Sequence, residues 1–240
     1  PLRSSAASDV YKRQDNGHVT EYQSVWDLPE VMMQVGAWPM VPSLGREICA
    51  PAPASGDGLL RMDRDVEHSQ NSRQLIIDML SKMILHPGKG GPEIMELSRF
   101  WHPKMNWYGP AGIGTARGID GFRNWHQIPF LNAMPDRGKK VDDVTHHFFA
   151  DNDYVGFTGW PDMIQTLSHS GWLGLPPLNR EISMRSLDFW RVEKGLIREN
   201  WVMVDLLHIY DQIGVDVLAR MREFNKARIN GIASHAEALQ

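Results

Sequence analysis

Two acidic residues near the end of the chain, Asp188 and Asp205, are the first candidates for acid–base chemistry. They lie on two segments of alternating character, Ile182–Val192 and Leu196–Asp205, which flank the dipeptide Lys194-Gly195. A two-residue turn of this kind predicts a β-hairpin, and a period of two then sorts its side chains between two faces. In the register set by that turn, one face mixes carboxylates with large apolar groups: Met184, Ser186, Asp188, Trp190, Ile197, Glu199, Trp201, Met203 and Asp205.

Asp205 is the preferred catalytic group of this face. Burial against Met184, Trp201 and Met203 would raise the pKa of its carboxyl above the ordinary value of about 3.9, toward a value suited to proton exchange. An Asp just before Leu206-Leu207 can also cap a helix by accepting a backbone N–H. The sequence leaves both interpretations open.

Asp188 and a set of aromatic, Met and His residues complete the predicted site. Asp188 is the second acid–base candidate; the alternative is a strand carboxylate paired with a nearby Arg. Adjacent strand residues point to opposite faces, so at most one of His146 and His147 faces a pocket, and we select His147. The predicted substrate-binding residues are Trp107, Tyr108, His126, His147, Met184, Trp190, Trp201 and Met203.

Spacings typical of metal or cofactor sites do not occur in the sequence. There is no His-Glu-x-x-His and no metal-spaced trio, and Cys49 is the single cysteine, which excludes an internal disulfide. The glycine-rich run Gly109–Gly118 lacks the strand-to-helix context of a dinucleotide loop. We therefore expect no metal and no cofactor, and the lack of a Walker loop or Gly-x-Ser-x-Gly elbow argues against nucleotide and serine hydrolases.

Composition narrows the class of partner. The 240 residues carry a formal net charge of -4. Because the chain has no excess of basic residues, we expect no nucleic-acid partner. No apolar run reaches the roughly 18 residues needed to span a bilayer, so we expect no membrane partner. Nine Trp and 13 Met residues suit a core or a pocket for a flat hydrophobic small molecule, which is the expected substrate.

Helical patterns precede strand patterns along most of the chain. Asn71 or Ser72 can cap a helix whose apolar residues follow a three–four spacing, and His86-Pro87-Gly88 ends it. Later come the segments Val141–Phe149 and Tyr154–Thr166, which flank a turn, and then the hairpin described above. This order predicts an α+β domain with helices packed on one face of a curved antiparallel sheet.

The sequence also contains an internal repeat. Asp15–Gly36 aligns without a gap to Glu193–Gly214 at an offset of 178, with six of 22 residues identical. We interpret residues 15–36 as the last strand and helix of a first repeat, 37–64 as a Pro/Gly-rich linker, 65–225 as a complete domain and 226–240 as a tail. Residues 1–14 resemble translated adapter sequence, and we predict a non-native leader there.

Four segments carry a specific resemblance: Phe100-Trp101-His102-Pro103, Gly118–Phe122, Phe189–Gly195 and Glu199–Asp205. In this order and spacing they resemble the SnoaL-like polyketide cyclase (ester cyclase) family. The resemblance implies the nuclear transport factor 2-like cone fold and an acid–base Asp late in the last strand, which matches Asp205. Known members place a partner His on the preceding strand, and this sequence has no His between Glu181 and Gly195.

The function implied is that of a cofactor-independent cyclase or isomerase that removes a proton next to a carbonyl of a hydrophobic substrate. A non-catalytic ligand-binding or dimerisation domain of the same fold is the alternative, and a hydrolase or dehydratase using Asp188 with Asp205 is a further one. We expect a homodimer or an intramolecular pairing of the two repeats in the full-length protein. We also expect a cytoplasmic location, with any targeting signal lost together with the native N-terminus.

Overall fold

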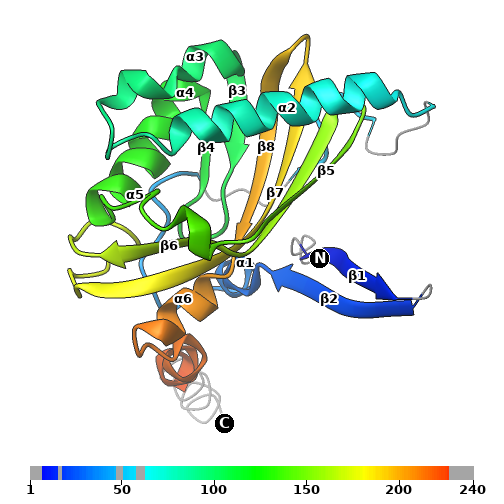
Figure 1. Cartoon of the computed structure of the whole chain (residues 1–240). Coiled ribbons are helices and arrows are strands. Elements are labelled where there is room, and N and C mark those ends of the chain that lie inside the picture. The colour runs from blue at the N-terminus through cyan, green and yellow to red at the C-terminus, as the bar shows by residue number, and fades with distance from the viewer. Residues whose placement is uncertain (1–6, 16–17, 47–50, 58–62, 227–240) are drawn as a thin grey trace.

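The fold is built on a curved six-stranded sheet, with helices α2 to α5 gathered on one side of it and a separate two-stranded sheet formed by β1 and β2 (Figure 1). The computed structural model describes residues 7–15, 18–46, 51–57 and 63–226. Figure 1 shows the long helix α2 crossing the sheet, with α3, α4 and α5 beside it and α6 near the chain's C-terminal end. Among the described residues, no helix is both long and apolar enough to cross a membrane.

The strands are β1 (Ala7–Asp15), β2 (His18–Trp26), β3 (Trp101–Tyr108), β4 (Thr115–Arg117), β5 (His146–Asp151), β6 (Tyr154–Leu167), β7 (Arg180–Glu193) and β8 (Leu196–Val204). The helices are α1 (Leu28–Gln34), α2 (Val66–Met83), α3 (Leu97–Phe100), α4 (Gly118–Phe122), α5 (Ile128–Ala133) and α6 (Leu206–Gln212). Shorter 3-10 turns occupy Pro92–Met95 and Val141–Asp143, a π-helical turn occupies Arg123–Gln127, and residues 217–226 are helical.

The main sheet has six strands in the order β4-β3-β8-β7-β6-β5. The predicted α+β class with helices on one face is confirmed. One pairing was not predicted: β3 runs parallel to β8, while the other neighbours are antiparallel. Because β3 enters from the helical segment rather than from a hairpin, its direction is not tied to that of its neighbour, and the sheet is mixed.

The two predicted hairpins are present. Between β7 and β8, Lys194 and Gly195 both have positive φ, 52° and 77°. This left-handed pair matches the right-handed twist of the two strands and closes the turn tightly. Between β5 and β6, Asn152 has a φ of 49°, and Asn tolerates this conformation better than most residues.

The β7–β8 hairpin contains a β-bulge close to its turn. Val192 pairs with Ile197, but the next pair is Arg191 with Glu199, so Arg198 is an extra residue on β8. A one-residue shift moves every later side chain of that strand to the other face. The pairings predicted without the bulge, Trp201 with Asp188 among them, are therefore wrong: Asp188 pairs with Val202.

Helix α2 covers the concave face of the sheet. Its buried residues Ile76 and Met79 join one large apolar core with residues of β3, β6 and β7. The helix begins earlier than predicted, because Asp65 caps it by accepting a hydrogen bond from the backbone N–H of His68 at 3.0 Å. Ser72, a predicted cap, is buried inside the helix instead.

The N-terminal segment forms a hairpin and a helix of its own. The strand and helix predicted in residues 15–36 are β2 and α1. The sequence of residues 1–14 shows no strand period, yet Ala7–Asp15 pairs with β2; residues 1–6 lie outside the described residues. The predicted tail also lies outside them beyond Lys226.

Part of the predicted linker lies on the convex face of the sheet. The backbone N–H of Ala54 donates to both carboxylate oxygens of Glu199 at 3.1 Å, and the indole N–H of Trp201 donates to the Pro51 carbonyl at 2.9 Å. Glu199 is fully buried and also accepts from Arg191 Nε at 2.6 Å. The buried ion pair thus anchors residues 51–57 to the sheet.

Candidate active site

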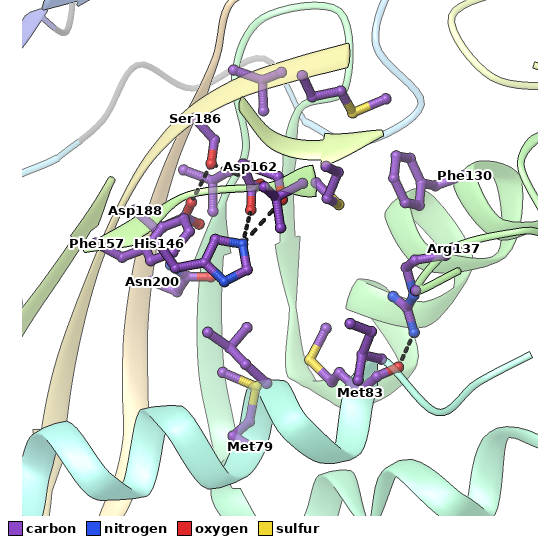
Figure 2. A pocket seen from close by; sticks show the side chains of 18 of the residues that line it. Met79, Met83, Phe130, Arg137, His146, Phe157, Asp162, Ser186, Asp188 and Asn200 are labelled. Atoms are coloured by element: carbon purple, nitrogen blue, oxygen red, sulfur yellow. Dashed lines mark hydrogen bonds and ion pairs between the residues drawn. The ribbon is translucent and has the colours of Figure 1, made fainter. Parts of the chain in front are cut away.

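A cavity of about 390 Å³ lies between the helices and the concave face of the sheet. A volume of this size accommodates a small organic molecule. Its walls are largely apolar and aromatic, and include Met79, Trp107, Phe130, Phe157, Met184 and Trp190. Figure 2 shows that polar side chains gather in one part of this cavity, while Arg137 lies apart from them.

The polar cluster is contributed by the four strands β5 to β8. Its members are His146, Asp162, Ser186, Asp188 and Asn200, all of which line the cavity. Ser186 and Asp188 lie two residues apart on β7 and so share the concave face. The bulge in β8 turns Asn200 toward the same face.

Asp188 is enclosed by protein, and the part of its side chain that remains accessible faces the cavity. Burial raises the pKa of its carboxyl well above the ordinary value of 3.8, and the nearby charge of Asp162 raises it further. Hydrogen bonds from Ser186 and Asn200 act in the opposite direction but are the smaller effects. The environment therefore favours a protonated Asp188.

Ser186 bridges the two carboxyl groups of the cluster. Its hydroxyl oxygen lies 2.9 Å from Asp162 Oδ2 and 3.1 Å from Asp188 Oδ2. A hydroxyl carries one proton and can donate to one carboxylate at a time. When Ser186 donates to Asp162, a protonated Asp188 can donate to Ser186, and both hydrogen bonds are then satisfied.

His146 extends the cluster toward solvent. Its Nε2 lies 3.0 Å from the backbone oxygen and 3.5 Å from the carboxylate oxygen Oδ1 of Asp162. The Asp162 carboxylate raises the pKa of His146 above 6.5. The side chain of His146 is 40% exposed and that of Asp162 is 13% exposed, so a chain of proton-carrying groups connects Asp188 to water.

A second polar region of the cavity contains His126 and Arg137. The imidazole of His126 stacks on Trp107 with ring centroids 4.2 Å apart, and burial lowers its pKa to about 3, so the ring is neutral. Arg137 donates to the backbone carbonyls of Met83 and His86. Burial lowers its pKa to about 10, which leaves the guanidinium charged at neutral pH.

No ion pair joins Arg137 to an acidic side chain in the ranges that the structure describes. Carbonyl oxygens are weak partners for a buried cation, and a full anion at hydrogen-bond distance would compensate its charge better. Arg137 lines the cavity. It therefore gives that part of the cavity a positive charge to which an acidic group of a ligand could bind.

Five of the ten predicted site residues line the cavity: Asp188, Trp107, His126, Met184 and Trp190. The other five do not lie among its lining residues: Asp205, Tyr108, His147, Trp201 and Met203. Of the two adjacent histidines, His146 is the one that lines the cavity, so the selection of His147 was wrong.

Asp205 has the structural role that the sequence left open. Its Oδ1 accepts the backbone N–H of His208 at 3.0 Å and so caps α6, while Oδ2 lies 3.6 Å from Arg185. The predicted face of β8 was wrong because of the bulge at Arg198, which turns Trp201 and Met203 to the convex face. Tyr108 donates its hydroxyl proton to Glu199 on that face at 3.1 Å.

Sequence reasoning missed His146, Asp162, Ser186, Asn200 and Arg137 as site residues. Ser186 was predicted on the correct face but not selected. The signal for Asp162 was weak: it lies where the β6–β7 register shifts, between Gly159 and Met163, and Pro161 in this segment indicates an interrupted strand. Among the described residues, no group of three His, Cys, Asp or Glu side chains could hold a metal ion.

Comparison with known proteins agrees with this architecture. The sequence model of the family described as SnoaL-like polyketide cyclase matches residues 92–213. No curated protein matches the chain significantly. The solved structure of a candidate SnoaL-like polyketide cyclase from Jannaschia sp. CCS1 is similar over 64% of this chain and 98% of its own, with 13% identity and a TM-score of 0.51; at this identity the similarity shows the fold alone.

Two further solved structures are similar at lower scores. IdmH, a candidate polyketide cyclase from Streptomyces antibioticus, is 23% identical over 58% of this chain and 98% of its own, with a TM-score of 0.44. An NTF2-like protein from Burkholderia xenovorans LB400 is 16% identical over 60% of this chain and 96% of its own, with a TM-score of 0.43.

Proposed function

The chain belongs to the SnoaL-like polyketide cyclase family, and on this premise we propose that it is a cofactor-independent cyclase or isomerase. In this proposal it moves a proton next to a carbonyl group of a hydrophobic small molecule. Asp188 replaces Asp205 as the group that carries the proton. The observation that supports this assignment is a carboxyl of raised pKa in an enclosed, largely apolar cavity.

The first step uses Asp188 as a base. A carboxylate whose pKa is raised holds a proton more strongly than an ordinary one, so its ionised form is a better match for a weakly acidic C–H bond. Asp188 takes the proton, and the electron pair of the C–H bond moves into the neighbouring carbonyl as an enolate. A 1,3-dicarbonyl substrate spreads this charge over two oxygens by itself.

The second step completes the reaction and restores Asp188. The enolate carbon attacks another carbonyl of the same molecule and the new alkoxide takes the proton back, which is cyclisation; alternatively a different carbon takes the proton, which is isomerisation. Before the first step, Ser186 can pass the proton of a protonated Asp188 to Asp162, which leaves Asp188 ionised as the base, and His146 exchanges protons with water. Ser186, Asp162 and His146 act in this scheme as positioning and relay residues.

The charge of Arg137 indicates a substrate with an acidic or strongly polar end. Asp188 and Arg137 both line the cavity, with aromatic and Met side chains in its walls. A flat molecule that carries a ketone near Asp188 and a carboxylate near Arg137 fits this polarity. Neutral His126, stacked on Trp107, adds a polar edge without a second charge.

Deuterium uptake by simple ketones tests the proton-transfer step without knowledge of the natural substrate. We would follow uptake at the carbon next to the carbonyl of α-tetralone and of 4-oxo-4-phenylbutanoate in D₂O by NMR. We expect the unchanged protein to accelerate uptake and Asp188→Asn to lose at least 99% of the acceleration, as is typical for loss of a general base. Asp205→Asn, which keeps a helix-capping side chain, is the matched control and should exchange at the full rate.

Full exchange by a folded Asp188→Asn protein would show that Asp188 is not the base. A protein that binds both ketones without accelerating exchange would instead be a ligand-binding module of this fold. Binding is measured separately, by the shift of the unfolding temperature with each ketone.

A further inference from the structure

His126 is a titratable side chain of the cavity that the proposed proton transfer does not use. It lies in the π-helical turn Arg123–Gln127, in which the backbone N–H of Ile128 donates to the carbonyl of Arg123. Single π-turns of this kind often occur at functional sites. The imidazole lines the cavity, and a polar ring in a largely aromatic wall requires a physical reason.

Packing alone does not explain a histidine at position 126. The imidazole stacks on Trp107, and its ring centroid lies 5.5 Å from those of both Phe122 and Phe130. Phe122, His126 and Phe130 follow one another at intervals of four residues and form a row of rings on one side of the helical segment. A phenylalanine ring would pack in this row as well and would bring no polar atom into it.

Neither ring nitrogen of His126 has a hydrogen-bond partner among the residues that the structure describes. Nδ1 is fully enclosed. The part of the side chain that remains accessible faces the cavity, so Nε2 is the nitrogen that a ligand can reach. A buried polar atom without a partner costs free energy, and a ligand that bonds to Nε2 removes part of this cost.

The surroundings of the ring determine which nitrogen carries its proton. Burial and the positive charge of Arg137 lower the pKa of His126 to about 3, so the ring is neutral and holds one N–H. Buried N–H groups without an acceptor are rarer than acceptors without a donor, and Nδ1 is the enclosed nitrogen. The proton therefore belongs on Nε2, where it can be donated to a ligand.

Arg137 offers a second donor, and it lies close enough for its charge to act on His126. Its Nε and Nη2 donate to the carbonyls of Met83 and His86, at and just beyond the C-terminal end of α2. Nη1 donates to no acceptor in the part of the chain that the structure describes. Because the two bonded nitrogens fix the plane of the guanidinium, the third is held in place for a ligand.

The charges around Arg137 favour an anion over a neutral acceptor. The charge of Arg123 acts on Arg137 and, after burial, is the second cause of its lowered pKa. Neither arginine forms an ion pair with an acidic side chain within the described ranges. An anion near two like charges stabilises the charged form of both.

We propose that His126 and Arg137 together bind the carboxylate of an acidic substrate, with His126 donating Nε2–H and Arg137 donating Nη1–H. A carboxylate accepts two such hydrogen bonds at once, one on each oxygen. The stack on Trp107 fixes the direction of the imidazole donor. His126 is thus a specificity-determining residue, and the inference rests on the substrate polarity of the proposed function but not on the role of Asp188.

Two probes that cannot undergo the proposed reaction test this subsite. 4-Phenylbutanoate carries a carboxylate, n-butylbenzene has nearly the same shape without it, and neither contains a ketone. By calorimetric titration at neutral pH, we expect His126→Phe to weaken the binding of 4-phenylbutanoate at least tenfold and to leave that of n-butylbenzene unchanged. His126→Gln, whose side-chain N–H can reach the place of Nε2, should recover part of the affinity.

The stability of the protein without a ligand separates a binding role from a structural one. His126→Phe keeps a ring in the aromatic row and removes two unpartnered nitrogens, so it should raise the unfolding temperature. A lower unfolding temperature, with an equal loss of affinity for both probes, would show that His126 serves packing and would overturn the proposal.

NMR of isotope-labelled histidine locates the proton directly. The signals that disappear in His126→Phe belong to His126, and we expect them to show a proton on Nε2 that shifts downfield when 4-phenylbutanoate binds. A proton on Nδ1 in the complex, or no binding of 4-phenylbutanoate to the unchanged protein, would contradict the subsite. Either result would leave the deuterium uptake of neutral α-tetralone, and with it the proposed role of Asp188, unaffected.

Discussion

The hydroxyl oxygen of Ser186 lies 3.1 Å from a carboxyl oxygen of Asp188, and it is also bonded to Asp162. One hydroxyl proton thus serves two acidic groups. The protonation of Asp188 depends on where that proton points, and this dependence can be measured.

Ser186→Ala should move the pH dependence of activity upward. The Ser186 hydrogen bond lowers the pKa of Asp188, so its loss leaves the carboxylate less stable. A hydrogen bond to a charged group contributes about 1.5–3 kcal/mol, so the midpoint of the acidic limb of the rate profile should move upward by about one to two pH units. Ser183→Ala, on the same strand but bonded to Gln212, should leave the acidic limb unchanged. If Ser186→Ala also leaves it unchanged, Ser186 does not bridge the two carboxyl groups.

Asp188→Asn should stabilise the protein increasingly as pH rises. The folded state raises the pKa of Asp188, so it holds the proton more tightly than the unfolded chain, and ionisation at higher pH costs stability. The difference in unfolding free energy between variant and parent should grow above pH 3.8, by at most about 1.4 kcal/mol per pH unit, and level off once Asp188 has ionised. Denaturant titrations from pH 4 to 9 measure this difference in unfolding free energy. A difference that does not change with pH would contradict the burial of the Asp188 carboxyl.

Asp205→Ala should lower stability and leave catalysis intact. The loss of a helix cap costs about 1 kcal/mol, and Asp205 lies outside the cavity-lining residues. Thermal unfolding and the deuterium-uptake rate per folded molecule measure the two effects. Asp205→Ser keeps a capping oxygen and should recover most of the stability, whereas a loss of rate in both variants would restore Asp205 as a catalytic candidate.

Arg137→Gln should discriminate between acidic and neutral ketones. If the guanidinium binds a substrate carboxylate, its removal should raise the KM for 4-oxo-4-phenylbutanoate about 10- to 100-fold, the range expected for a charge-assisted hydrogen bond. The KM for α-tetralone should change far less. The ratio of the two KM values is insensitive to a general loss of stability. An unchanged ratio would contradict the binding of a substrate carboxylate by Arg137.

The arrangement of elements was largely predictable from the sequence. The three–four spacing that ends at Met83 forms α2, and the Lys194-Gly195 turn forms the last hairpin. These predictions succeed because apolar period and turn chemistry are local properties. The parallel contact of β3 with β8 depends on how distant segments pack, and no local pattern indicates it.

The site was predictable only where β7 alone determines it. Met184, Asp188 and Trp190 lie on the predicted face, since nothing interrupts the alternation of β7 between them. The residues taken from β8 were wrong, because a single extra residue is invisible in a pattern of period two. Arg137 lies in a loop, where only the tertiary structure shows that its side chain meets the cavity.

The bulge at Arg198 has an evolutionary consequence. The bulge determines which alternate side chains of β8 face the cavity. The gain or loss of one codon at this point would therefore replace all the side chains that the later part of this strand contributes to the binding site. Descendants of one ancestor could in this way acquire unlike interiors, and different acidic groups within them, by one small step that leaves the rest of the gene untouched.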